Sequence, residues 1–235
     1  MEFSIYLLLV LIEYVLLVST AAPFILVNRF TKTPSVGIAV WFTLFFTAMA
    51  AAVLAVGIAV WSIVETYLLL QTKTDIWVIL AVSFAPWLLL AFAGILLALS
   101  NQRLEPLFRA AKEFDQLALL ARREVEAFHR AKVYELEIPG FIALTKGYEI
   151  YLSRAVFELP EQQLNAVLWH EYGHIRLGHQ RLKRITHLMM QLTPWFVVSK
   201  AFNAEVARLC ETSADKYALK RVYSKDLAEA RAHFS

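Results

Sequence analysis

His170-Glu171-Tyr172-Gly173-His174 is the stretch that carries the most chemical information in this sequence, and it reads as HExxH. In a helix, residues four apart lie on one face, so the two histidines would point the same way. Two imidazoles in that arrangement can bind one Zn²⁺, and Glu171 between them can act as the base that activates a water. The alternative is a pair of surface histidines one turn apart on an amphipathic helix. We expect the metal site, because the surrounding sequence agrees with it.

The composition indicates an integral membrane protein with room for one modest soluble domain. Hydrophobic residues make up 59% of the 235 residues, which is a larger share than soluble domains have. The net charge is only +3 and no block of basic residues stands out, so nothing favours nucleic acid as a partner. Cys210 is the single cysteine, which excludes an intrachain disulfide and a cysteine-rich metal site.

Three apolar stretches predict transmembrane helices, at about residues 5–27, 38–62 and 76–99. Glu13 lies inside the first stretch, where it would either contact another helix or stay protonated or locally hydrated. The second stretch belongs to a longer apolar run, so we expect its helix to project beyond the bilayer. Residues 1–102 are therefore predicted to form a transmembrane domain whose partner is the lipid bilayer.

The charges of the connecting loops predict how these helices are oriented. The first loop carries Arg29 and Lys32, whereas the second carries Lys73 balanced by Asp75, and several basic residues follow the third stretch. Positive residues favour the cytoplasmic side of a membrane. We therefore expect a multi-pass protein of the cytoplasmic (inner) membrane, with its N-terminus outside and residues 103–235 in the cytoplasm.

The part after residue 102 is expected to combine helices with a small antiparallel sheet. The spacing of apolar residues predicts a helix over about 106–131, packed in the domain or lying on the membrane. An alternating pattern over 133–138 and two short runs flanking Lys146-Gly147 predict three strands. Such a sheet could offer its edge to an extended peptide, or it could be purely structural.

The HExxH helix is predicted to begin near Leu159-Pro160-Glu161, since proline and an acid suit a first turn. His179 is five residues beyond His174 and off the i+4 line, so we expect it on the surface rather than at the metal. The apolar segment at residues 185–202 is too short and too broken for a further span. It would pack against the membrane or be buried in the domain, and it would hold the site close to the bilayer.

A two-histidine zinc site needs a third protein ligand, and Glu211 is the best candidate. Glu211 and Asp215 are four residues apart in a segment, 204–220, that is predicted to be helical, so they share a face. Asp215 could accept a hydrogen bond from a ligating histidine and fix its tautomer. An ExxxD pair alone would be an ordinary solvated face, but its place after HExxH favours the ligand interpretation. The final residues, 221–235, are predicted to form a charged helical tail.

Taken together, these features resemble the membrane metallopeptidases of the BlaR/MecR type. The resemblance rests on the apolar spans, the small sheet, HEYGH at 170–174, an apolar segment containing PWF, and CETSAD at 210–215. More distantly, the chain is similar to HtpX-type and CAAX-processing proteases, which share HExxH followed by ExxxD. The chain ends at Ser235 without a segment leading to an extracellular penicillin-binding sensor, so beta-lactam sensing is not expected. The apolar segment before ExxxD is also shorter than the paired spans of the HtpX type.

The resemblance implies both a fold and a ligand set. The fold would be that of a mainly α-helical membrane protein, with three transmembrane helices and a small α+β metallopeptidase domain of the gluzincin type. In gluzincins the glutamate of ExxxD is the third zinc ligand. One Zn²⁺ per chain would then be bound by His170, His174 and Glu211, with Glu171 as general base and Asp215 supporting the site.

The sequence therefore predicts a zinc endopeptidase that cleaves a protein or peptide at the cytoplasmic face of the membrane. Regulatory proteolysis is the use that the resemblance implies, and an HtpX-like quality-control protease is an alternative. A third alternative is a membrane regulatory or scaffold protein that binds metal without turnover. The presence of Glu171 favours an enzyme, because an inactive site could lose that residue freely.

Overall fold

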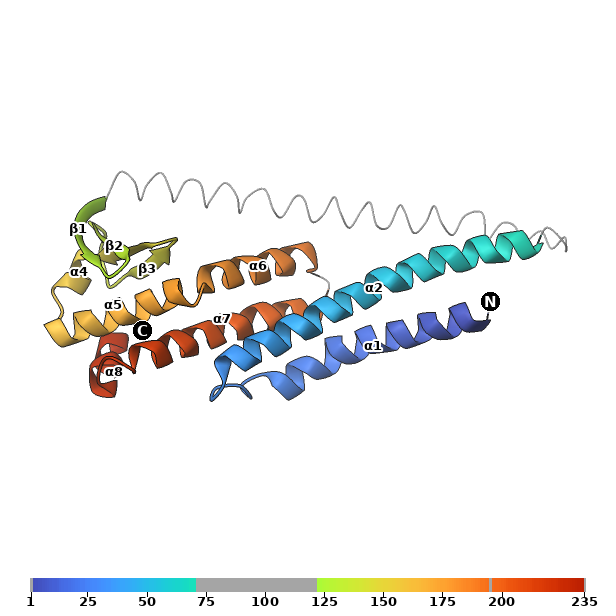
Figure 1. Ribbon diagram of the computed structural model, residues 1–235, viewed down its shortest axis with the longest axis horizontal. Helices are drawn as coiled ribbons and strands as arrows, with labels where there is room; N and C mark the ends of the chain where they lie inside the picture. Colours follow the sequence, from blue (N-terminus) through green and yellow to red (C-terminus); the bar gives the residue numbers. More distant parts are fainter. Residues whose placement is uncertain (1, 71–121, 195, 235) are drawn as a thin grey trace.

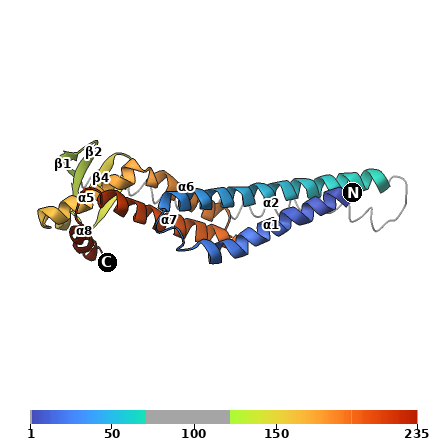
Figure 2. The same ribbon diagram turned by 60° about the horizontal axis from the view of Figure 1, so that its bottom comes forward.

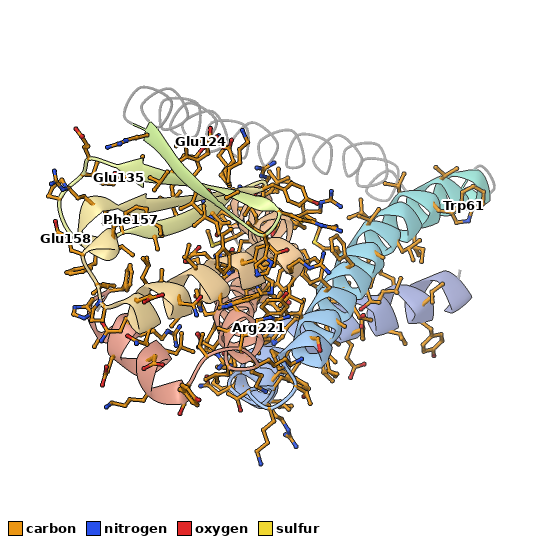
Figure 3. All side chains as sticks on the ribbon, turned by 60° about the vertical axis from the view of Figure 1, so that its left-hand side comes forward. Trp61, Glu124, Glu135, Phe157, Glu158 and Arg221 are labelled. Carbon is orange, nitrogen blue, oxygen red and sulfur yellow. The ribbon has the colours of Figure 1, made fainter. Side chains whose placement is uncertain are left out.

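The computed structural model describes residues 2–70, 122–194 and 196–234. They form an elongated molecule, with two long apolar helices toward one end and a mixed helix-and-sheet domain at the other (Figure 1, Figure 2). Trp61 on the second apolar helix lies at the opposite end of the molecule from Glu135 in the sheet (Figure 3). The predicted third span, 76–99, lies outside the described residues and stays a prediction.

The two apolar helices are α1 (Glu2–Leu26) and α2 (Pro34–Leu70), which pack side by side. Each contains a stretch long and apolar enough to cross a membrane, Tyr6–Leu26 in the first and Pro34–Trp61 in the second. Large apolar side chains are exposed along both helices, and Phe24 is 90% exposed. Their positions agree with the first two predicted spans, and α2 continues past its apolar stretch as expected.

The sheet has four strands, and it is mixed rather than antiparallel. β3 and β4 form the hairpin predicted around Lys146-Gly147, but β4 also pairs with β2 in parallel, which corrects the prediction of a purely antiparallel sheet. The parallel pair is possible because the chain crosses over between β2 and β3, which leaves β3 at the edge. The strand order is β1-β2-β4-β3. The strands are β1 (Arg122–Phe128), β2 (Ala131–Leu136), β3 (Ala143–Lys146) and β4 (Glu149–Ser153).

Strand β1 overturns part of another prediction, because residues 122–128 were expected to end a helix. β1 pairs antiparallel with β2 through a tight turn at His129, whose φ is 56°. The hydrogen bonds to β2 outweigh the helical spacing of the apolar residues, since strand preference depends on the partner that the tertiary structure provides. The earlier part of the predicted helix, 106–121, is outside the residues that the structure describes.

The remaining elements are helices, and α5 lies at their centre. It begins at Glu161, directly after Pro160, as predicted. It packs against β3, β4, α7 and α8. The predicted tail at 221–235 contains α8, which is not a free tail, because Leu227 and Ala230 are buried in the core beneath the sheet. The helices are α4 (Arg154–Phe157), α5 (Glu161–Arg176), α6 (His179–Leu192), α7 (Val197–Ala218) and α8 (Ser224–Ala232).

The apolar segment 185–202 forms the tip of a hairpin made by α6 and α7, and this tip packs against α1 and α2. Phe202 stacks on Phe45 of α2, with ring centroids 4.6 Å apart. Val198 belongs to the same buried cluster, which also includes Val18 of α1. The segment is therefore buried where the domain meets the two apolar helices, and it joins these two parts of the molecule.

The loop between α1 and α2 contacts α7 further along that helix. The backbone N–H of Asn28 donates to the carboxylate of Glu205 over 3.0 Å, and the ammonium group of Lys216 donates to the carbonyl of Lys32 over 2.6 Å. Glu211 lies on α7 between these two contacts. The predicted third ligand, Glu211, therefore lies at the same position along α7 as the contacts with the α1–α2 loop.

Candidate metal centre and catalytic cleft

The structure brings His170, His174 and Glu211 together from two helices. The histidines lie one turn apart on α5, both buried, with their Nε2 atoms 3.2 Å apart. Oε2 of Glu211, on α7, is 3.3 Å from Nε2 of His170 and 3.5 Å from Nε2 of His174. Three potential ligand atoms thus converge on one point.

The separations of these atoms suit a single tetrahedral ion such as zinc. Zinc ligands about 2.0–2.1 Å from the metal lie roughly 3.3 Å from one another in a tetrahedron. The three observed separations run from 3.2 to 3.5 Å. Two imidazoles and one carboxylate are also a ligand set of catalytic zinc sites, which keep a fourth position open. The residues present therefore fit a catalytic metal ion.

Gly173 allows α5 and α7 to approach closely enough to form this group. A Cβ atom at Gly173 would lie 3.3 Å from the Cα and carbonyl oxygen of Ala214 and from Cβ of Tyr217. Ala214 is on the same helix as Glu211, three residues further along. The contact at Gly173 therefore also sets how far Glu211 lies from the two histidines.

Asp215 contacts the side of His170 that faces away from the other candidate ligands. Its Oδ1 accepts a hydrogen bond from Nδ1 of His170 over 2.9 Å, and its Oδ2 lies 2.6 Å from the guanidinium of Arg231 on α8. This contact directs Nε2 of His170 toward the metal position. Burial lowers the pKa of His170, but the hydrogen bonds to Asp215 and Glu211 outweigh burial and raise this pKa to about 9. Metal binding near neutral pH must therefore displace a proton.

His179 is buried beside His174, which corrects the expected surface position. The residue is 2% exposed, and its Nδ1 is 2.9 Å from Nδ1 of His174. Gly178 adopts a left-handed conformation, φ 66°, between α5 and α6. The chain changes direction there, so the helical spacing that placed His179 on the surface does not apply. Burial, and then the neighbouring His174, lower the pKa of His179 to about 3. A neutral His179 can accept the Nδ1 proton of His174, which directs Nε2 of His174 toward the metal position.

Lys183 contacts the third candidate ligand in a similar way. Its Nζ donates to Oε1 of Glu211 over 2.6 Å, while Oε2 faces the histidines. Burial raises the pKa of Glu211, but hydrogen bonds to His170, His174 and Lys183 lower it well below the usual range, so the group is a carboxylate. Sequence reasoning missed Lys183. It follows His179 by one turn of α6, but that position is informative only once the bend at Gly178 is known.

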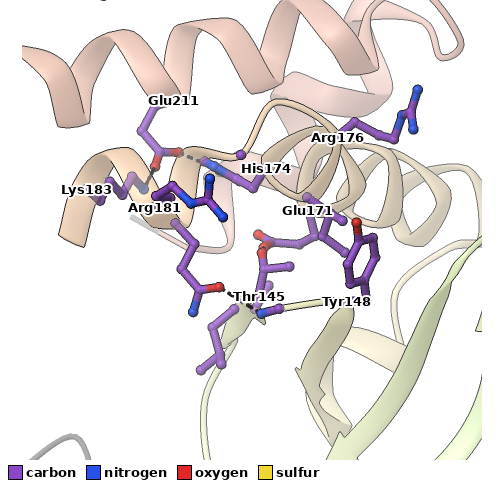
Figure 4. A pocket seen from close by; sticks show the side chains of 14 residues that line it. Thr145, Tyr148, Glu171, His174, Arg176, Arg181, Lys183 and Glu211 are labelled. Atoms are coloured by element: carbon purple, nitrogen blue, oxygen red, sulfur yellow. Dashed lines mark hydrogen bonds and ion pairs between the residues drawn. The ribbon is translucent and has the colours of Figure 1, made fainter. Parts of the chain in front are cut away.

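Glu171 faces a cleft along the edge strand β3. Oγ1 of Thr145, on β3, donates to Oε2 of Glu171 over 2.6 Å. Both residues line a cavity of about 680 Å³ together with His174 and Glu211 (Figure 4). Thr145 was also missed by sequence reasoning, because a hydroxyl on a short strand carries no signal of its own. It orients the predicted general base toward the open cleft.

A second cavity, of about 480 Å³, lies on the other side of the site. It shares Ala143, Glu171 and Glu211 with the first cavity, so the two cavities adjoin at the candidate metal centre. Its remaining walls come from α5, α8 and the residues that follow α8, and they are largely apolar. These wall residues are Val167, His170, Leu227, Ala230, Arg231 and Phe234.

The model of peptidase family M48 matches residues 109–205 of the chain. The matched stretch includes HExxH at 170–174 and ends before Glu211. A search for similar proteins among curated sequences finds none that matches. The family match supports a metallopeptidase, a hydrolase of peptide bonds, and it does not separate the BlaR/MecR type from the HtpX type.

Proposed function

We propose that this protein is a zinc-dependent endopeptidase, anchored in a membrane by α1 and α2, that cleaves a protein or peptide at the cytoplasmic face. The observation that carries the proposal is the convergence of His170, His174 and Glu211 beside Glu171 in an open cleft. The match to the M48 model agrees with this chemistry. Regulatory proteolysis remains the use implied by the resemblance to the BlaR/MecR type.

Each residue of the site has a defined task in peptide hydrolysis. A zinc ion held by His170, His174 and Glu211 would act as a Lewis acid toward a water and the scissile carbonyl. Glu171 accepts the proton of the attacking water and later delivers it to the leaving amine. Thr145 holds the carboxylate of Glu171 in the cleft through its 2.6 Å hydrogen bond.

The edge strand β3 supports an extended polypeptide as the substrate. Within the described residues, β3 pairs with β4 on one side only, and its residues 143–145 line the cleft. An extended peptide can pair with such an edge through main-chain hydrogen bonds. The cavities continue on both sides of Glu171, so a chain could extend past the site in both directions. That arrangement favours an endopeptidase over an enzyme that removes terminal residues.

The position of the site along α7 supports cleavage near a membrane surface. If α1 and α2 cross a bilayer, the loop between them lies at its surface, and Glu211 is level with that loop. The loop carries Arg29 and Lys32, which favour the cytoplasmic side. The α/β domain lies on this same side of the two helices, so its substrates would be held close to the cytoplasmic surface.

The test compares zinc content and proteolysis for the full-length wild type and Glu171→Gln in detergent. We expect about one zinc ion per chain in both proteins, since Glu171 is not one of the converging ligands. Cleavage of an unfolded protein should fall by roughly 10²–10⁴-fold in the variant, because the proton acceptor is lost. Glu161→Gln is the matched control, since Glu161 is an exposed acid on the same helix. Glu211→Ala should lose the zinc.

Two outcomes would contradict the proposal. Equal proteolysis by the wild type and Glu171→Gln, with zinc bound to both, would favour the non-catalytic scaffold. Unchanged zinc affinity in Glu211→Ala would remove Glu211 from the ligand set.

A further inference from the structure

The catalytic cleft continues into a third cavity that the proposed reaction does not use. This cavity has a volume of about 710 Å³ and lies between the β3–β4 turn and the start of α6. It shares Gly147, Tyr148, Gln180 and Arg181 with the cavity that contains Glu171. A polypeptide that leaves the catalytic centre along β3 would therefore pass directly into it.

The walls of this third cavity are strongly cationic. Among the residues that the structure describes, one acid, Glu149, lines it, and the hydroxyl of Tyr151 donates to that carboxylate. Lys132 also lies 3.5 Å from Glu124, but both of these side chains are mostly exposed, so solvent screens their attraction. The basic residues that line the cavity are Arg130, Lys132, Lys146, Arg181 and Arg184. We call this group the cationic hollow.

The walls of the cationic hollow are held in place by a contact between its two sides. The backbone N–H of Gly147, in the β3–β4 turn, donates to Oε1 of Gln180 on α6 over 2.7 Å. This bond ties the turn of the hairpin to the helix that carries Arg181 and Arg184. Figure 4 shows Arg181 close to the catalytic part of the cleft, and Arg176, on α5, lines the catalytic cavity on the other side of His174. Through Arg181, which lines both cavities, positive charge extends from the catalytic cavity into the hollow.

We propose that the cationic hollow binds acidic side chains of the substrate, in a segment next to the one that is cleaved. This inference rests on the proposed peptidase function and adds the class of substrate, a polypeptide with a cluster of Asp or Glu residues beside the scissile region. Arginine guanidinium groups bind carboxylates through paired hydrogen bonds, and a cleft of one sign attracts oppositely charged ligands. The residues that line the hollow come from β2, β3, β4, the β1–β2 and β3–β4 turns, and α6. None comes from α1 or α2, which disfavours a lipid headgroup as the occupant.

The test measures binding and cleavage of two fluorescent peptides by the full-length protein in detergent. The peptides share one scissile segment and differ only in a flanking run of four glutamates or four glutamines. We expect the acidic peptide to bind metal-free protein about tenfold more tightly and to show a correspondingly lower KM in the zinc-loaded enzyme. The preference should shrink at high salt, because the charges are exposed.

The charge-reversal variant Arg130→Glu/Arg184→Glu should lose this preference and still cleave the neutral peptide, because neither residue lines the cavity that contains Glu171. Both arginines are exposed, Arg130 in the β1–β2 turn and Arg184 on α6, so the fold should tolerate the change. Lys220→Glu is the matched control, since Lys220 is exposed and lines none of the three cavities. Equal binding of the two peptides to wild-type protein would overturn the proposal. If the protein also bound phosphatidylglycerol, and the double variant abolished that binding, the hollow would be assigned to a lipid headgroup instead.

Failure of the proposed function gives a different result. In that case the metal-free protein would still prefer the acidic peptide, and the preference would still depend on Arg130 and Arg184, while zinc-loaded protein would cleave neither peptide. The binding measurement therefore tests the hollow and the cleavage measurement tests the catalytic centre.

Discussion

Each of the three candidate ligands has a neighbouring side chain that contacts the atom facing away from the metal position. Asp215 contacts Nδ1 of His170, His179 contacts Nδ1 of His174, and Lys183 contacts Oε1 of Glu211. Such partners hold the ligating side chain in its binding orientation, so that side chain loses less conformational freedom when a metal binds. Each of the three ligand atoms is therefore directed by a side chain outside the ligand set.

We expect His179→Leu to weaken zinc binding by about 10–100-fold, because His174 would lose the partner of its Nδ1 atom. His179→Asn should retain most of the affinity, since the amide can hydrogen-bond the same atom. The measurement is the zinc Kd, obtained by competition with a chromophoric chelator. His187→Leu is the matched control, because His187 lies on the same helix and is only partly buried. If His179→Leu bound zinc as tightly as His187→Leu, the proposed role of His179 would be wrong.

At the scale of the elements, the site depends on two local features of α5. The close approach at Gly173 brings α7 against the face that carries the histidines, and the break at Gly178 places the first turns of α6 beside His174 and Glu211. As a result, α5 provides the two imidazoles, α7 the carboxylate, and α6 the partners of His174 and Glu211. The edge strand β3 completes the cleft through Thr145.

Replacing Gly173 by leucine should push α5 and α7 apart, because the nearest atoms include the backbone of Ala214, which cannot rotate away. We expect a loss of stability of about 1–3 kcal/mol from overpacking, together with weaker zinc binding as Glu211 moves from the histidines. The measurements are the Tm and the zinc Kd. Gly57→Leu on α2 is the control, since a Cβ at Gly57 meets no atom within 4 Å. Equal Tm and Kd in the two variants would show that the close approach does not position Glu211.

At the scale of the whole molecule, the catalytic domain and the apolar helices share a buried cluster. The α6–α7 tip packs on α1 and α2 through residues such as Phe202 and Val198. Glu205 is 3% exposed, and its carboxylate bonds both the N–H of Asn28 and the guanidinium of Arg208. These contacts hold the candidate metal centre at a fixed distance from the two apolar helices. A membrane crossed by α1 and α2 would thereby determine which substrates reach the cleft.

The stability of the metal-free molecule should be greatest near pH 6.5. The folded protein raises the pKa of His170 from 6.5 to about 9, so the stability that protonated His170 contributes is complete below pH 6.5 and is lost as the pH rises through 9. The folded protein lowers the pKa of His179 from 6.5 to about 3, so its contribution is present above pH 6.5 and is lost as the pH falls toward 3. We expect the Tm in a chelator to decrease on both sides of about pH 6.5.

Two controls separate these effects. His179→Leu should flatten the profile between pH 6.5 and 4.5, above the range in which the lowered pKa of Glu211 also reduces stability. Added zinc should remove the alkaline decrease, because a metal replaces the Nε2 proton of His170. A Tm that increases steadily from pH 6.5 to 9 in the presence of chelator would contradict the expected titration of His170.

Much of the local structure could be predicted from the sequence. The apolar runs that form α1 and α2, the start of α5 at Pro160-Glu161, the β3–β4 hairpin and the helical segment with Glu211 and Asp215 all follow from short-range patterns. Such patterns are readable because hydrophobic periodicity and turn residues act between near neighbours. Strand β1 was predicted wrongly as helix because its conformation depends on pairing with β2.

The sequence by itself therefore determined the chemical identity of the site. Two histidines one turn apart and an acid between them lie within one helix, and their relation needs no knowledge of the fold. Only the tertiary structure decided which residues surround them. Lys183, His179 and Thr145 reach the site from other elements, through the break at Gly178 and the pairing of β3 with β4. Contacts between elements depend on where each helix ends and in which direction the chain continues. The spacing of residues along one helix does not show either.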